Sequence, residues 1–148
     1  MTSVDIERNM LDLASHIVAR SQYIGKPVTN LHLQKILYFT LSETKEKQVL
    51  SEEELRSWYD LPFLVWRYGP VVEWIYHRYS IFGASDIFIP GTLDSRFDAL
   101  NGVIDTLLEK SPFELVKRTT EQDIYKANEH LIINGKSSIP YSFEDLKT

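Results

Sequence analysis

The chain has 148 residues, a length typical of one domain that buries its own hydrophobic core. It contains no cysteine, which excludes disulfides, thiol catalysis and cysteine zinc sites and suits the reducing cytoplasm. The formal net charge is −5, and no cluster of Lys and Arg is dense enough to reverse it locally. Direct nucleic-acid binding is therefore disfavoured.

The N-terminal segment shows neither a signal peptide nor a membrane span. No basic region there is followed by an apolar core, and no run in the chain approaches the roughly 18 apolar residues of a span. We therefore expect a cytoplasmic protein that does not contact the membrane.

Three helices are predicted before residue 60. The first extends from about Ser3 to Tyr23 and ends before Gly25 and Pro27. The second begins at a cap on Thr29 or Asn30. Its inward face comprises Leu33, Ile36, Leu37, Thr40 and Leu41. A short third helix follows Ser51, which starts a Ser-x-x-Glu capping box.

The segment from residue 63 to residue 83 is rich in aromatic side chains. Its first part, Phe63–Tyr68, predicts a short buried strand. Gly69 is predicted to cap a helix whose first residue is Pro70 and which ends near Phe82, before Gly83. Because this helix is apolar on most of its circumference, we expect it to be the central, buried element of the fold.

The C-terminal half predicts one more strand and three more helices. The strand, residues 86–89, is expected to pair antiparallel with residues 63–68. One helix is predicted over residues 94–110, and a second begins at a cap on Ser111. A third is predicted over residues 120–133 and ends before Asn134-Gly135. The tail 136–148, with a turn from Ser142, is expected to be flexible. The predicted fold is a single domain, mainly α with a small antiparallel β element (α+β).

Two segments resemble the Panacea domain family. The first is residues 31–39, with Leu33, Gln34, Lys35, Leu37 and Tyr38 at the motif positions. The second is residues 65–71, which contains Trp66, Gly69 and Pro70. The resemblance covers about residues 6–83. It fades in the helices 94–134, where Arg118–Glu121 replaces a Thr-His pair of the family.

The resemblance implies a non-enzymatic antitoxin of a bacterial or prophage toxin–antitoxin system, which binds and neutralises a protein toxin encoded nearby. Two alternatives stay open. One is an adaptor that delivers the toxin to a protease, and the other is a phage-associated protein that blocks a host defence protein. The divergent C-terminal helices are expected to give this chain its own partner specificity.

Aromatic and Arg side chains near the Gly-Pro turn are the expected partner contacts, since such residues dominate binding hot spots. These candidates are Arg67, Tyr68, Tyr76 and Arg78. Other motif residues are expected to be scaffold, among them Leu33, Leu37, Trp66 and Gly69.

Catalytic and metal-binding patterns are weak. The chain lacks phosphate-binding loops, nucleophile elbows and His-Glu-x-x-His, and its four histidines are scattered. Glu73 and His77 form the best local acid–base pair, but a surface ion pair explains their spacing more simply. Glu43-x-Lys45 matches a nuclease fragment only in part. No cofactor or metal is expected, and a hydrolase of unrecognised type is the remaining enzymatic alternative.

Overall fold

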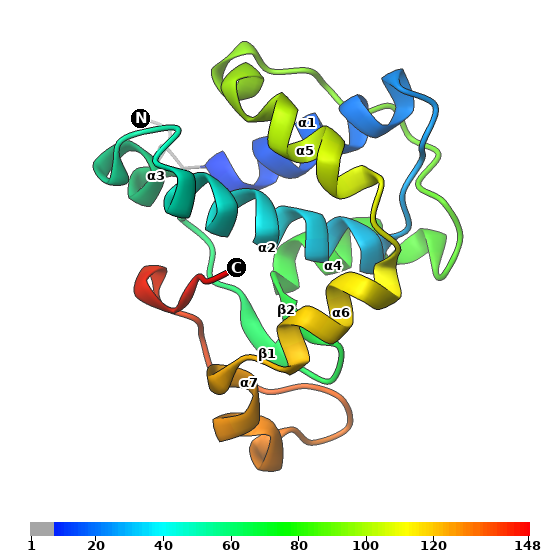
Figure 1. Ribbon diagram of the computed structural model, residues 1–148. Helices are drawn as coiled ribbons and strands as arrows, with labels where there is room; N and C mark the ends of the chain where they lie inside the picture. The colour runs from blue at the N-terminus through cyan, green and yellow to red at the C-terminus, as the bar shows by residue number, and fades with distance from the viewer. Residues whose placement is uncertain (1–7) are drawn as a thin grey trace, which may run out of the picture.

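Helix α2 (Asn30–Lys47) is the centre of the fold in the computed structural model, which describes residues 8–148. It runs between α1 (Asn9–Tyr23) and α5 (Asn101–Leu108) on one side and a β-hairpin and α6 (Pro112–Thr120) on the other (Figure 1). Even polar side chains of α2 are fully covered, including Lys35, Thr40 and Thr44. The fold is mainly helical with one small antiparallel sheet, as predicted.

The helix starts follow the predicted caps. Thr29, Ser51 and Ser111 each accept, through the side-chain oxygen, the backbone N–H three residues further on. These bonds open α2, α3 (Glu52–Trp58) and α6. The predicted start of the first helix, near Ser3, lies outside the described residues.

The Gly-Pro segment forms a hairpin, so the prediction that Pro70 begins a helix is wrong. Strand β1 (Leu64–Trp66) pairs antiparallel with β2 (Gly69–Val71), and Val65 lies opposite Pro70. Pro70 fits there because the Val65 carbonyl needs no N–H from β2: it points away from β2 and accepts from the Ser137 hydroxyl at 2.5 Å. Helix α4 (Glu73–Tyr79) begins only after Val72.

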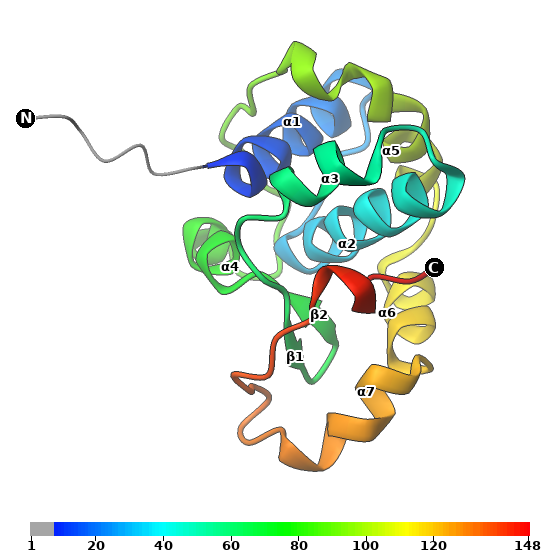
Figure 2. The ribbon, with the colours of Figure 1, turned by 90° about the vertical axis from the view of Figure 1, so that its left-hand side faces the viewer.

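Helix α4 lies at the edge of the molecule, not at its centre (Figure 2). Ile75 and Tyr79 are buried, whereas Trp74 is 69% exposed and Ile81, just beyond the helix, is 85% exposed. The prediction of a central, buried helix here is therefore wrong, and α2 has that role.

The prediction of a strand at residues 86–89 is also wrong. Asp86 forms an isolated bridge with Thr29, and the N–H of Ile87 donates to the carbonyl of Val28 at 2.9 Å. This segment covers the start of α2 and does not pair with β1. Its predicted place in the sheet is taken by β2.

The C-terminal half follows the predicted helices with shorter lengths. A 3₁₀ helix (Ser95–Leu100) precedes α5, and α6 follows at its predicted cap. Helix α7 (Asp123–Asn128) begins after Gln122, because Thr120 still belongs to α6. Two further 3₁₀ turns, Glu129–Leu131 and Phe143–Asp145, follow α7, and another, Ser80–Phe82, directly follows α4.

The tail 136–148 is packed onto the body, contrary to the predicted flexible segment. Its first part runs along the free edge of β1, where the N–H of Tyr141 donates to the carbonyl of Phe63 at 2.8 Å. Further along, Tyr141, Phe143 and Leu146 are buried in the core. The predicted turn at Ser142 is confirmed and carries a capping box. The tail is thus a structural element.

Candidate functional site

Residues 31–39 and residues 65–71 meet at the contact between α2 and the hairpin. The Lys35 ammonium donates to the carbonyl of Pro70 at 2.7 Å, and the N–H of Val72 donates to the Gln34 side-chain oxygen at 2.9 Å. One turn earlier, the Asn30 amide donates to the carbonyl of Tyr76 at 2.9 Å. Three polar side chains within the first two turns of α2 therefore fix β2 and α4.

Lys35 is unusual because its side chain is fully buried. Burial away from water disfavours the charged form and lowers the pKa of Lys35 to about 7. Its ammonium donates to a backbone carbonyl, and no carboxylate lies within ion-pair distance among residues 8–148. The Lys35 amine thus holds the hairpin through one hydrogen bond, and its removal from water costs free energy.

The other motif residues are buried and make contacts within the chain. Leu33, Leu37 and Tyr38 are fully buried in the core, and the Trp66 indole donates to the carbonyl of Ser137 at 3.1 Å. Gly69 has a φ of +98°, and a Cβ there would lie 3.0 Å from the Thr119 Cβ. A side chain at that position would therefore be both strained and obstructed.

A groove of about 430 Å³ opens beside the hairpin. Three of the four predicted partner contacts line it: Arg67, Tyr68 and Tyr76. The Tyr76 ring packs edge-on against Trp66, with ring centroids 5.2 Å apart, and Tyr68 is 53% exposed. The structure thus gathers aromatic side chains from β1, the turn and α4 around one concave surface.

Arg78, the fourth candidate, lies elsewhere. It lines a smaller depression of about 250 Å³ beside the start of α1, together with Asp12 and Asp94. The structure does not bring it to the groove.

Lys136 belongs to the groove, and the sequence reasoning missed it. Its ammonium lies 4.9 Å from the centroid of the Trp66 ring. It is held by a tight turn in which Ile133 and Lys136 exchange backbone hydrogen bonds of 2.9 and 3.1 Å. Asn134 and Gly135 between them both have positive φ. Asn-Gly is the strongest short-range signal of a hairpin, so this turn was detectable from sequence.

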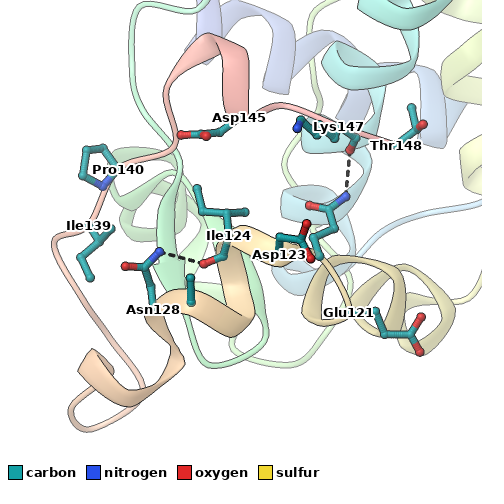
Figure 3. Close-up of a pocket in the computed structure, with 11 residues that line it drawn as sticks. Glu121, Asp123, Ile124, Asn128, Ile139, Pro140, Asp145, Lys147 and Thr148 are labelled. Carbon is teal, nitrogen blue, oxygen red and sulfur yellow. Dashed lines mark hydrogen bonds between the residues drawn. The ribbon is translucent and has the colours of Figure 1, made fainter.

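Another depression, of about 640 Å³, lies between the start of α7 and the tail (Figure 3). Glu121 and Asp123 line it from the helical side, and Asp145 and Lys147 from the tail. The hydrogen bonds drawn there are internal ones, from Asn128 to the carbonyl of Ile124 and from Gln122 to the carbonyl of Lys147. The second of these bonds holds the tail in place.

The catalytic candidates behave as surface and structural groups. Glu73 and His77 are both exposed and 3.9 Å apart. The Lys45 ammonium donates to the carbonyls of Phe143 and Leu146 at 2.9 and 3.1 Å, so it anchors the tail. Within residues 8–148, no group of three or more His, Asp or Glu side chains is arranged to hold a metal ion. None of the helices in that range has the length and apolar character to cross a membrane.

Comparison with known proteins gives no assignment. Family models, curated proteins and solved structures yielded no significant match to this chain.

Proposed function

We propose that this chain is an antitoxin: a non-enzymatic, cytoplasmic protein that neutralises a cognate protein toxin by direct binding. The observation that carries the proposal is the groove beside the hairpin. It gathers Arg67, Tyr68 and Tyr76 next to the two segments that resemble the Panacea domain. Aromatic and Arg side chains on a concave surface are typical of binding hot spots.

Occlusion is the mechanism we propose. The toxin would place a functional segment in the groove, where it can no longer reach its target. The surface is preorganised, because Lys35 and Gln34 hold β2 and the groove-lining Tyr76 packs on Trp66. Preorganisation reduces the conformational entropy lost on binding and so strengthens affinity.

Co-expression with the adjacent open reading frame tests the proposal. We expect the neighbouring protein to stop growth when expressed alone, and to be harmless and co-purified when this chain is present. A neighbour that is harmless and unbound would overturn the antitoxin assignment.

Single substitutions test the groove itself. We expect Arg67→Ala and Tyr76→Ala each to weaken binding of the neighbour by more than about 1 kcal/mol, the threshold commonly used for a hot-spot contact. Phe113→Ala is the matched control, because Phe113 is 83% exposed on α6 and lies outside the groove. Melting curves of all three variants separate lost contacts from lost folding. Neutralisation unchanged by both groove variants would exclude this surface.

The half-life of the neighbour separates occlusion from delivery to a protease. Under occlusion, the bound neighbour persists at least as long as the free one. A neighbour that is degraded faster when this chain is present would identify an adaptor instead. If the neighbour is unbound, affinity capture from host cells with this chain as bait tests the alternative that it blocks a host defence protein.

A further inference from the structure

The groove carries positive charge in a chain that is acidic overall. Arg67 and Lys136 line it, and none of its lining residues is Asp or Glu, although the whole chain has a net charge of −5. Among residues 8–148, neither cation has a carboxylate within ion-pair distance. Their charges are thus available to a ligand.

The two cations are held in fixed positions by the backbone. The N–H of Arg67 donates to the carbonyl of Gly135 at 2.9 Å, which ties the hairpin directly to the turn that carries Lys136. On the other side, the Tyr125 hydroxyl donates to the carbonyl of Arg67 at 2.9 Å. The backbone at Arg67 is therefore tied to the turn that carries Lys136.

Both cations lie over aromatic rings. The Lys136 ammonium is 4.9 Å from the Trp66 centroid and 5.9 Å from that of Tyr76, and the Arg67 guanidinium is 5.4 Å from that of Tyr68. Such contacts orient a cation without neutralising it. An anion placed in the groove would meet two oriented positive charges.

Apolar surface accompanies these charges. Tyr68 is 53% exposed at the turn of the hairpin, and Ile133, bonded to Lys136 across its own turn, is 73% exposed. Exposed apolar groups beside a groove indicate a protein contact better than a free inorganic anion, which has no apolar part to bury. The volume of about 430 Å³ suits a few side chains of a chain segment.

We infer that the groove binds an acidic segment of a protein partner, in which Asp or Glu side chains flank an apolar residue. The carboxylates pair with Arg67 and Lys136, and the apolar residue packs on Tyr68 and Tyr76. This inference rests on the proposed function and specifies the chemistry of its partner. A nucleic-acid strand is disfavoured because the rest of the acidic chain repels a phosphate backbone.

Selection of short random peptides on the immobilised full-length chain tests the inference without the toxin. We expect the selected peptides to be enriched in Asp and Glu next to an apolar residue. Binding of a fluorescein-labelled selected peptide should weaken as NaCl is added, because salt screens exposed charges. The outcome does not depend on whether the neighbouring protein is toxic.

Charge variants locate the binding. We expect Lys136→Glu and Arg67→Glu each to weaken peptide binding about tenfold or more, equivalent to about 1.4 kcal/mol. Lys117→Glu on α6 should leave it unchanged, because Lys117 is exposed and outside the groove. Lys136→Gln keeps part of the apolar stem on Trp66 and loses the charge, so it provides the test if Lys136→Glu fails to fold.

Three results would overturn the inference. The first is selection of peptides without acidic enrichment, or of none above the starting library. The second is binding that Lys136→Gln and Arg67→Glu leave unchanged in folded protein. The third is Lys136-dependent binding of a labelled single-stranded oligonucleotide in preference to the acidic peptides, which would assign the groove to nucleic acid.

Discussion

The Lys35 ammonium lies 2.7 Å from the carbonyl oxygen of Pro70, in a place that water does not reach. This contact joins the central helix to the hairpin and connects two segments 35 residues apart. The hairpin positions Arg67 and Tyr68 at its turn, so the geometry of the groove depends on this buried amine. Lys35 is thus a positioning residue that does not itself face a partner.

The buried amine should make stability depend on pH. The pKa of Lys35 is about 7 in the folded state and 10.5 in its ordinary state. Between these values the unfolded chain binds more protons, so the free energy of unfolding should rise with pH. We expect a rise approaching about 1.4 kcal/mol per pH unit between pH 7 and 9.5, measured by urea denaturation.

Lys35→Met is the matched control, because Met is unbranched, apolar and similar in length. It leaves the Pro70 carbonyl without its donor, a cost of about 1–3 kcal/mol that does not vary with pH. The difference in slope between the two proteins is therefore the quantity to compare. Equal slopes would show that Lys35 stays charged in the folded protein. The measurements stop below pH 10, because tyrosines of the unfolded chain ionise near that pH, whereas burial raises the pKa of Tyr38 to about 12 in the folded protein. Above pH 10 the tyrosines would therefore add their own pH dependence.

Gly69→Ala should destabilise the protein more than Gly25→Ala. Both glycines have positive φ, +98° and +76°, so both substitutions carry a backbone cost of about 1 kcal/mol. A Cβ at Gly25 meets open space, whereas one at Gly69 would overlap Thr119 and lie 3.2 Å from the Lys35 Cε. We expect at least about 1 kcal/mol of additional loss for Gly69→Ala, by urea denaturation. Equal losses would mean that Thr119 moves aside freely.

Three capping signals were read correctly from the sequence. The caps at Thr29, Ser51 and Ser111 depend only on residues within one helical turn, and each makes the predicted bond. The buried face of the second helix was recognised for the same reason, since apolar residues at helical spacing leave few alternatives.

Errors arose where distant contacts decide the conformation. Pro70 satisfies the rules for the first residue of a helix and equally those for an edge strand. The choice is made by Lys35 and Gln34, whose bonds to Pro70 and Val72 no local pattern reveals. The tail was wrongly predicted to be flexible for the same reason, because contacts with the free edge of β1 and with Lys45 hold it in place.

The same distinction applies to the groove. Arg67, Tyr68 and Tyr76 were found because aromatic and Arg residues cluster along the sequence there. Arg78 does not join them, since it lines the smaller depression beside the start of α1; its role as a partner contact stays a prediction. Lys136 joins them from a turn nearly 70 residues away, a contact that only the folded chain creates.

Two tyrosines of the core should respond oppositely to loss of the hydroxyl. The Tyr38 hydroxyl donates to Gln122 at 2.7 Å and accepts from the N–H of Lys147 at 3.2 Å. Tyr38→Phe should therefore cost about 1–2 kcal/mol, because both partners lose a buried bond. The Tyr141 hydroxyl is buried with no partner in the described part of the chain, so Tyr141→Phe should be neutral or stabilising. Urea denaturation of both variants makes the comparison, and equal destabilisation would point to an undetected partner of Tyr141.

Removal of residues 142–148 should destabilise the protein by about 3–6 kcal/mol. The deletion exposes the sites of Phe143 and Leu146, whose burial contributes about 1.5–3 kcal/mol each. It also leaves the Lys45 ammonium without its carbonyl acceptors. Since small domains have a total stability of only about 5–15 kcal/mol, the shortened chain should melt at a much lower temperature.

A short Gly-Ser extension after Thr148 is the control for this deletion, because Thr148 is exposed. We expect the extended chain to melt at the same temperature as the original. If the deletion left the melting temperature unchanged as well, the contacts of Phe143, Leu146 and Lys45 would contribute no net stability. The tail would then be free to act as a separate arm, which is one way for an adaptor to reach its protease. If stability falls as expected, an adaptor must use a surface of the folded body to reach its protease.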